Sequence, residues 1–237
     1  MSNIINTIKN NIPNAVTSIN LLCGTLAIIA AFNCFDDVIW GLQGYQLAFL
    51  LIALGAVADF CDGLVARLLN AVSGIGKELD SLSDLVTFGL APAMVLYNMM
   101  HEAYPDSCVA LTAVLLPVFG ALRLAKFNVD TEQTTTFKGL PIPANAIFWI
   151  GYCAWFATHH TIAPWVTVVY IVALSLLMVC NMRMFSFKLH GFNLRESWAQ
   201  FLLVIAAIAC VVTMGLPGLA VTVALYIVLS TAKTEVK

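Results

Sequence analysis

The sequence predicts an all-α membrane protein, a polytopic bundle of transmembrane helices. Hydrophobic residues make up 61% of its 237 residues and charged residues only 10%, whereas a soluble domain carries roughly a quarter charged residues. The apolar residues also form runs of about 20, the length that a helix needs to span a bilayer. The sequence has no basic patch for nucleic acid, and its seven cysteines are scattered without metal-ligand spacing.

Hydropathy divides the chain into eight candidate membrane-spanning segments. They cover residues 16–35, 45–69, 80–100, 107–127, 141–159, 163–182, 197–213 and 215–232. The last two are separated only by Met-Gly-Leu-Pro-Gly, so they could instead form one kinked element. A membrane bundle of this size forms one unit, and we therefore expect a single domain over residues 1–237.

The residues before the first segment favour a short helix that lies in the membrane interface. Isoleucines fall on one helical face and Asn and Lys on the other over residues 4–12. Pro13 follows, and we expect it to break this helix because proline cannot donate a backbone hydrogen bond. A frayed terminus is an equally good interpretation of the same residues.

The basic residues orient the predicted bundle. With the N-terminus inside, all eleven Lys and Arg residues fall on inner segments and none on outer loops. A wrong segment count would have placed the basic residues after the error on outer loops. The partition therefore favours both the count of eight and an inner, cytoplasmic position for the N-terminus.

Five carboxylates lie between Ala58 and Gly89, at the inner ends of the second and third segments. A charged side chain at membrane depth costs free energy, so its presence there indicates a functional role. Asp59 and Asp62 are three residues apart and share a helical face, as do residues 80 and 84, which are four apart. A short loop joins the two segments, so we expect four carboxylates to converge at the inner rim.

Four carboxylates so close together need protons or cations to coexist. Carboxylate oxygens suit hard cations such as Mg²⁺ or Mn²⁺, and four acids could hold two ions, as in phosphoryl-group chemistry. Gly63 and Ala66 leave room beside the acids, and Arg67 offers a fork for phosphate. Two other interpretations are helix-end charges, with Asp59 paired to Arg67, and a transporter with Asp59 and Asp62 on a cation path. The confinement of these acids to one hairpin weakens the transporter interpretation.

The spacing of these residues resembles the signature of the CDP-alcohol phosphatidyltransferases. The stretch reads Asp59-x2-Asp62-Gly63-x2-Ala66-Arg67-x8-Gly76-x3-Asp80-x3-Asp84 and matches the family at every position. The resemblance implies that the four aspartates bind two divalent cations, Mg²⁺ or Mn²⁺, and that Asp84 is also the general base. It further implies contacts with a CDP-lipid by residues of the signature and of the first segment: Gly63, Ala66, Arg67, Ser73, Gly76, Asn14, Thr17 and Asn20.

Four further stretches resemble the membrane-integral phosphatidylserine synthases of this family: residues 12–24, 81–93, 120–130 and 137–146. The resemblance implies an enzyme that moves a phosphatidyl group from CDP-diacylglycerol to L-serine and releases CMP. It also implies an active site at the cytoplasmic face of the inner membrane, contact with membrane lipid, and a homodimer. The catalytic core would cover about residues 12–182, with additional spans over about 197–232.

Serine is a zwitterion, and its carboxylate needs a cationic partner. Arg123 and Lys126 lie three residues apart near the inner end of the fourth segment, on one helical face. Asn145 follows two prolines, at a point where irregular backbone can line a site. We therefore expect these three residues to bind serine, although membrane anchors and a helix start are alternative interpretations. Acceptors that carry phosphate, such as glycerol 3-phosphate or an inositol phosphate, would require more arginine than this region offers.

Overall fold

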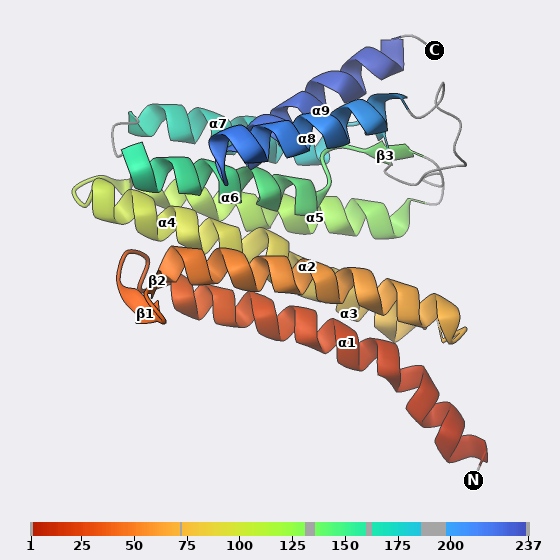
Figure 1. The fold of residues 1–237 in the computed structure, drawn as a ribbon. Helices are drawn as coiled ribbons and strands as arrows, with labels where there is room; N and C mark the ends of the chain where they lie inside the picture. Colours follow the sequence, from red (N-terminus) through yellow and green to blue (C-terminus); the bar gives the residue numbers. More distant parts are fainter. Residues whose placement is uncertain (1, 72, 131–135, 160–162, 186–197, 236–237) are drawn as a thin grey trace. The chain divides into compact units, whose positions relative to one another are not determined.

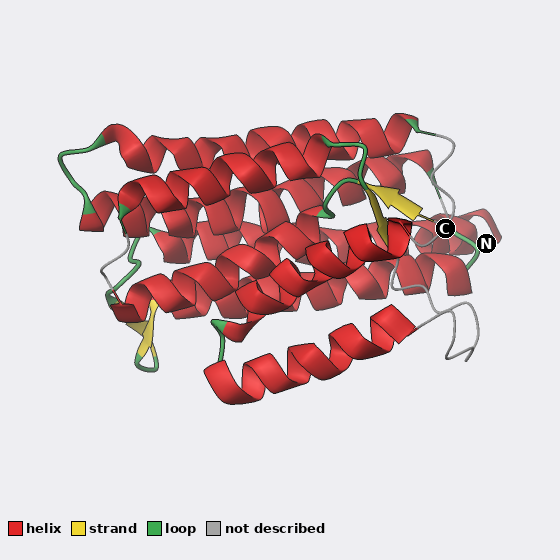
Figure 2. Ribbon diagram, turned by 90° about the horizontal axis from the view of Figure 1, so that it is seen from above, coloured by secondary structure: helices red, strands yellow, loops and turns green. Residues whose placement is uncertain are grey.

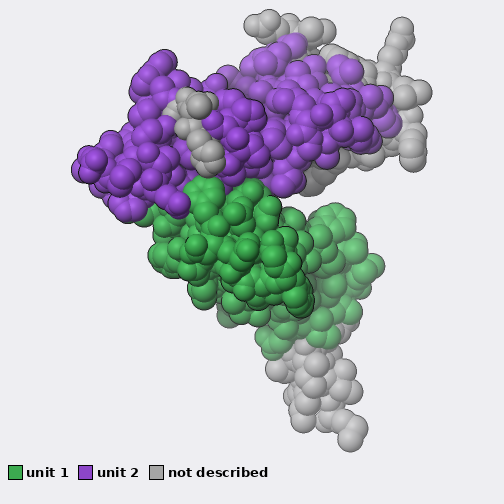
Figure 3. Space-filling view, turned by 60° about the vertical axis from the view of Figure 1, so that its left-hand side comes forward, with its two compact units in different colours: residues 1–98 green, residues 99–237 purple. Residues whose placement is uncertain are grey.

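The computed structural model describes all residues except 1, 72, 131–135, 160–162, 186–197 and 236–237. The described chain is predominantly helical, as predicted, with only short strands between the helices (Figure 2). It forms two compact units, Met1–Asn98 and Met99–Lys237, which are coloured separately in Figure 3.

The first unit contains the long helices α1 and α2, which lie side by side (Figure 1). Its elements are α1 (Ser2–Ala31), β1 (Asp37–Ile39), β2 (Leu42–Gln43), α2 (Gly44–Leu68), α3 (Gly74–Asp84), the π-helix η1 (Leu85–Leu90) and the first part of α4 (Ala91–Ala103). Strands β1 and β2 pair antiparallel and form the turn that connects α1 to α2. The two helices are therefore antiparallel, and the predicted aspartates of α2 lie near its other end, beside the N-terminal part of α1.

The second unit combines helices with one small antiparallel sheet. Its elements are the 3₁₀ helix η2 (Cys108–Val114), α5 (Leu115–Val129), β3 (Thr136–Lys138), α6 (Ile142–His159), α7 (Pro164–Val179), β4 (Arg183–Phe185), α8 (Trp198–Met214) and α9 (Gly218–Glu235). Strand β3 pairs with β4, with Lys138 opposite Arg183. The sheet thus joins the segment after α5 to the segment after α7.

Each of the eight predicted segments contains a helix, and four helical stretches are long and apolar enough to cross a membrane. These are Asn11–Ala31, Gly44–Leu68, Gly74–Ala103 and Cys108–Val129. By length and composition the chain is an integral membrane protein of helical architecture. The count of eight spans and their orientation remain predictions; of the residues that entered them, Lys188, Arg195, Lys237 and the start of the seventh segment lie outside the described residues.

The predicted break at Pro13 is wrong. Pro13 lies inside α1, which runs from Ser2 to Ala31, so residues 2–12 are the first part of a long helix rather than a separate short one. Proline removes one backbone donor, but its fixed φ angle is close to the helical value. The helix therefore continues and bends in its N-terminal part (Figure 1), as helices with an internal proline commonly do.

Two glycines let the helices of the first unit approach closely. A Cβ atom on Gly24 of α1 would collide with Thr87 of η1, and one on Gly55 of α2 would lie 2.6 Å from the Thr87 Cγ2 atom. Both contacts would be closer than a packed side chain accepts. Helices α1 and α2 can therefore close around Thr87 only because these positions carry no side chain.

Candidate active site

Three of the four predicted aspartates form one group. Asp59 and Asp62 come from α2, and Asp80 comes from the neighbouring α3. One carboxylate oxygen of each lies within 4.8 Å of the others. The structure therefore brings these three acids together, as the helical spacing predicts.

The turn between α2 and α3 makes this convergence possible. Asn70 adopts a positive φ of 49°, a conformation that asparagine tolerates better than most residues. Ser73 then caps α3, since its Oγ atom accepts a hydrogen bond of 3.0 Å from the Gly76 backbone N–H. The chain reverses within a few residues, and Asp80 faces the acids of α2.

Asp84 lies one helical turn beyond Asp80 and is not part of the group of three. Its carboxylate is within hydrogen-bonding reach of Asp59 and accepts a hydrogen bond of 3.4 Å from the Asn20 Nδ2 atom. The π-helix η1 begins directly after Asp84. Such π-helical turns occur frequently at functional sites, and nothing in the hydropathy pattern signals this one.

Helix α1 is attached to α3 and η1 by side chains that sequence reasoning did not select. Ser83 donates a hydrogen bond of 3.4 Å to the Thr17 carbonyl, and Thr87 donates one of 3.0 Å to the Asn20 carbonyl. All four residues are buried. The bonds hold Thr17 and Asn20 beside the acids, and the Thr17 hydroxyl is within hydrogen-bonding reach of Asp62.

The acids fit a divalent cation on chemical grounds. Asp62 is only 6% exposed, and its Oδ2 atom is buried without a hydrogen-bond partner among the described residues. A buried carboxylate oxygen without a partner is costly, whereas a bound cation would satisfy it. The donors are oxygens alone, the set preferred by hard cations such as Mg²⁺ and Mn²⁺.

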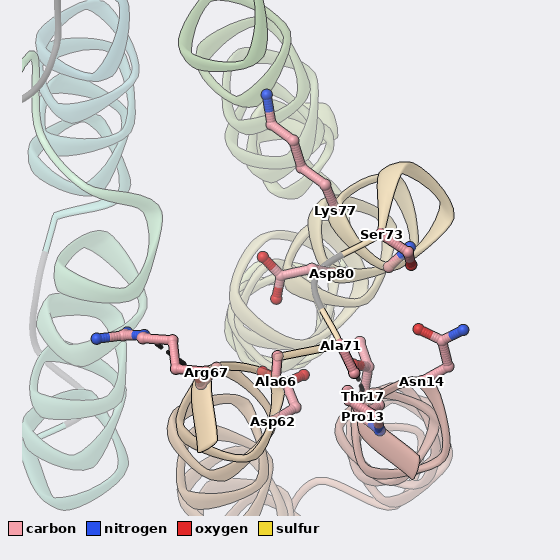
Figure 4. A pocket seen from close by; sticks show the side chains of 12 residues that line it. Pro13, Asn14, Thr17, Asp62, Ala66, Arg67, Ala71, Ser73, Lys77 and Asp80 are labelled. Carbon is pink, nitrogen blue, oxygen red and sulfur yellow. Dashed lines mark hydrogen bonds between the residues drawn. The ribbon is translucent and has the colours of Figure 1, made fainter. Parts of the chain in front are cut away.

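A cavity of about 240 Å³ opens beside Asp62 and Asp80 (Figure 4). Besides these two acids its lining comprises Pro13, Asn14, Thr17, Gly63, Ala66, Arg67, Ala71, Ser73, Gly76 and Lys77. The structure thus gathers seven of the eight predicted CDP-lipid residues around one hollow. The exception is Asn20, which lies beside Asp84 and does not line it.

Arg67 of this cavity makes a different contact from the pairing with Asp59 expected of helix-end charges. The Arg67 Nε atom donates a hydrogen bond of 3.1 Å to the Gly63 carbonyl, and the side chain extends away from Asp62 (Figure 4). No ion pair between Arg67 and Asp59 is present in the described part of the chain. Lys77 also lines the cavity, although sequence reasoning did not select it. Lys77 lies three residues before Asp80, and this spacing on a helix could have predicted that the two share a face.

The second unit contains the three residues predicted to bind serine. Arg123 and Lys126 line one cavity of about 480 Å³. Asn145 is fully buried and is not part of that lining. Its Oδ1 atom accepts a hydrogen bond of 3.1 Å from Trp149, and its Nδ2 atom has no partner among the described residues. The structure therefore brings together two of the three residues.

Residues 10–232 match the family model described as CDP-alcohol phosphatidyltransferase. The chain belongs to the CDP-alcohol phosphatidyltransferase family. The match includes every residue of the aspartate signature, and it extends through both compact units.

Several curated members of the CDP-alcohol phosphatidyltransferase family resemble this chain over most of its length. A Bacillus subtilis protein is 37% identical over 188 residues, which are 79% of this chain and 97% of that protein. A Helicobacter pylori protein (strain 26695) is 31% identical, covering 91% of this chain and 87% of its own length. A Mycobacterium tuberculosis protein (strain H37Rv) is 32% identical, with 90% and 73% covered. Each is named CDP-diacylglycerol–serine O-phosphatidyltransferase.

Proposed function

We propose that this enzyme transfers the phosphatidyl group of CDP-diacylglycerol to the hydroxyl group of L-serine and releases CMP. The observation that carries the chemistry is the group of Asp59, Asp62 and Asp80 at the edge of a cavity lined by the residues expected to bind a CDP-lipid. The choice of serine is supported by the names of the relatives. Family membership also argues against the transporter interpretation of the same acids.

The aspartates of the signature would hold two divalent cations, Mg²⁺ or Mn²⁺. Asp59, Asp62 and Asp80 supply the oxygen donors, and Asp84 is close enough to Asp59 to complete the set. When bound, such cations polarise the diphosphate and stabilise the charge that develops during an in-line displacement. The acids in turn need the cations, because mutual repulsion would otherwise force some of them to take up protons.

Asp84 would act as the general base. It accepts the proton of the serine hydroxyl as the serine oxygen forms a bond to the phosphorus that carries diacylglycerol. The bond between that phosphorus and the bridging oxygen breaks, and CMP leaves with the electron pair. The hydrogen bond from Asn20 fixes the orientation of the Asp84 carboxylate.

The remaining residues of the cavity would bind the nucleotide part of the CDP-lipid. Arg67 and Lys77 contribute positive charge for the diphosphate, and Gly63 and Gly76 keep its approach free of side chains. Asn14 and Thr17 on α1 present polar groups that can bind cytidine. Arg123, Lys126 and Asn145 would bind serine.

The distribution of charge supports an orientation with the aspartates at the cytoplasmic face, and the expected location is the inner membrane. Since all eleven basic residues fall on the predicted inner segments, the aspartates would face the cytoplasm, where serine and CDP-diacylglycerol are available. Membrane lipid would surround the apolar helices, and a homodimer is the expected assembly.

The proposed acceptor can be tested by offering the purified protein several alcohols. CMP release from CDP-diacylglycerol would be measured in detergent with L-serine, glycerol 3-phosphate or an inositol phosphate. We expect release with L-serine and only background release with the two phosphates. Release with a phosphorylated alcohol and none with serine would assign a different acceptor to the same chemistry.

A further inference from the structure

We infer that the hairpin between α1 and α2 is a lipid-contact surface, in which the Trp40 side chain enters the membrane interface. The contact lies at the end of α2 opposite the aspartates. The partner is the boundary between the lipid headgroups and the acyl chains. The inference rests on the membrane character of α1 and α2, and it is independent of the proposed reaction.

The hairpin lies where a membrane surface is expected. It connects two candidate spans, Asn11–Ala31 and Gly44–Leu68. Strands β1 and β2 extend sideways across the ends of α1 and α2 rather than away from them, as both ribbon views show (Figures 1 and 2). Because helices that cross a bilayer run roughly along its normal, a hairpin in this direction lies along the membrane surface.

The apolar side chains of the hairpin are exposed at its tip. Trp40 is 95% exposed, Ile39 46% and Val38 37%. Tryptophan is enriched at membrane interfaces, because its ring has a large apolar surface while its N–H group can bond to hydrated headgroups. The only charged residue of the hairpin, over residues 37–43, is Asp37. An apolar contact, rather than attraction to anionic headgroups, would therefore hold the tip in the interface.

The turn holds Trp40 in a backbone conformation that bulky residues disfavour. Ile39 pairs with Leu42, so Trp40 and Gly41 form a two-residue loop, and their φ angles are 53° and 74°. Both positions of such a loop usually carry Asn, Asp or Gly, and a bulky residue with positive φ is an outlier. Strain of this kind persists only where the surroundings stabilise it. Since the Trp40 side chain is almost fully exposed, the lipid interface would supply that stabilisation.

Contacts at the base of the hairpin fix its direction. The Gly44 backbone N–H donates a hydrogen bond of 3.1 Å to the Asp36 carbonyl. The Gln43 Nε2 atom donates one of 3.0 Å to the Phe35 carbonyl. Gly44 also packs directly on the end of α1, because a Cβ atom there would collide with the Asn33 carbonyl oxygen. The hairpin is thus attached to the ends of both helices, and its tip is held to one side of them.

Tryptophan fluorescence of the full-length protein in vesicles tests the contact. The emission of Trp40 is the difference between the wild-type protein and Trp40→Phe, since the other tryptophans remain in both. The vesicles would contain phosphatidylcholine that is unbrominated, brominated near the headgroup end of its acyl chains, or brominated near the chain ends. We expect bromine near the headgroups to quench most of the Trp40 emission, and bromine near the chain ends to quench less of it.

Trp149→Phe is the matched control for this difference measurement. Trp149 is fully buried, so the emission that it contributes should resist both brominated lipid and the aqueous quencher acrylamide. Trp40→Phe replaces one exposed aromatic side chain by another, and we expect it to fold as the wild-type protein does. Equal elution volumes in size-exclusion chromatography and equal thermal midpoints in detergent would verify this before the spectra are compared.

Three results would overturn the lipid contact. Quenching of the Trp40 emission by acrylamide but not by brominated lipid would place the ring in water. Resistance to both quenchers would indicate that protein covers the ring, as a second copy of the chain would. Stronger quenching by bromine near the chain ends would place the ring in the bilayer interior instead of the interface. None of these measurements uses CMP release, so they remain decisive even if the proposed function fails.

Discussion

Asp62 illustrates how individual residues build the site. The motif spacing places it on the same face of α2 as Asp59, and the structure adds that one of its oxygens is buried without a protein partner among the described residues. Sequence reasoning could predict the convergence of Asp59, Asp62 and Asp80 because helical periodicity and a short loop determine it. The contact between Asn20 and Asp84 joins residues 64 positions apart, and no local pattern indicates it.

Asp84 can be tested as the general base by replacement with asparagine. Asp84→Asn retains the size and the hydrogen bond from Asn20 but cannot accept a proton. We expect kcat to fall by a factor of about 10² or more, the usual contribution of a general base, while binding of CDP-diacylglycerol largely survives. Glu78→Gln is the matched control, because Glu78 is an exposed acid on the same helix. Near-normal turnover in Asp84→Asn would exclude this role, and a loss of lipid binding would assign Asp84 chiefly to the cation.

Arg123 can be tested as the partner of the serine carboxylate. Its guanidinium carbon lies 5.6 Å from the centroid of the Phe127 ring, so a planar group is favoured at this position. We expect Arg123→Gln to raise the KM for serine about 10- to 150-fold with the KM for CDP-diacylglycerol little changed, and Arg123→Lys to recover only part of this. Equal effects on both KM values would indicate a membrane anchor. A rise confined to CDP-diacylglycerol would place Arg123 at the lipid phosphate.

The helices show which features hydropathy can predict. The ends of α2 and α6 fall within a residue or two of the predicted segments, because apolar length dominates the placement of a membrane helix. Hydropathy gave no indication that α1 continues through Pro13, that α3 begins at Gly74, or that η1 is a π-helix. These features depend on a cap, on a tolerated proline and on hydrogen bonds between helices, which an average over apolar residues does not detect.

Close packing around Thr87 is a testable property of the helices. Gly55→Ala places a methyl group 2.6 Å from the Thr87 Cγ2 atom, so we expect it to destabilise the protein by about 1–3 kcal/mol, the usual cost of overpacking. Gly74→Ala is the matched control, because its added methyl group meets nothing within 4 Å. Thermal unfolding in detergent should show a lower midpoint for Gly55→Ala alone. Equal midpoints in both variants would show that the helices do not need this glycine.

For the whole molecule, the sequence predicts eight membrane spans and their orientation, whereas helix length and composition identify four candidate spans. Four helical stretches have the length and hydropathy to cross a membrane, whereas the other apolar helices are shorter or less hydrophobic. The complete partition of the eleven basic residues predicts the orientation. Orientation therefore remains a prediction from charge.

The orientation can be measured with single cysteines in a cysteine-free background. Asp37→Cys lies in the predicted outer turn between α1 and α2, and Glu78→Cys lies at the predicted inner end of α3; both residues are exposed. A membrane-impermeant maleimide should label Asp37→Cys in intact cells and Glu78→Cys only after permeabilisation. The reverse pattern would place the aspartates on the outer face and contradict the proposed location.

The most direct test of phosphatidyl transfer by the aspartate site follows labelled L-serine into lipid. Purified protein would be incubated with CDP-diacylglycerol and labelled serine, and the label in phospholipid would be compared with the CMP released. We expect equal amounts of labelled lipid and CMP, complete loss of both in excess EDTA, and recovery with Mg²⁺ or Mn²⁺, because the convergent carboxylates need cations. Transfer at the full rate in excess EDTA, or CMP release without label in lipid, would contradict the account.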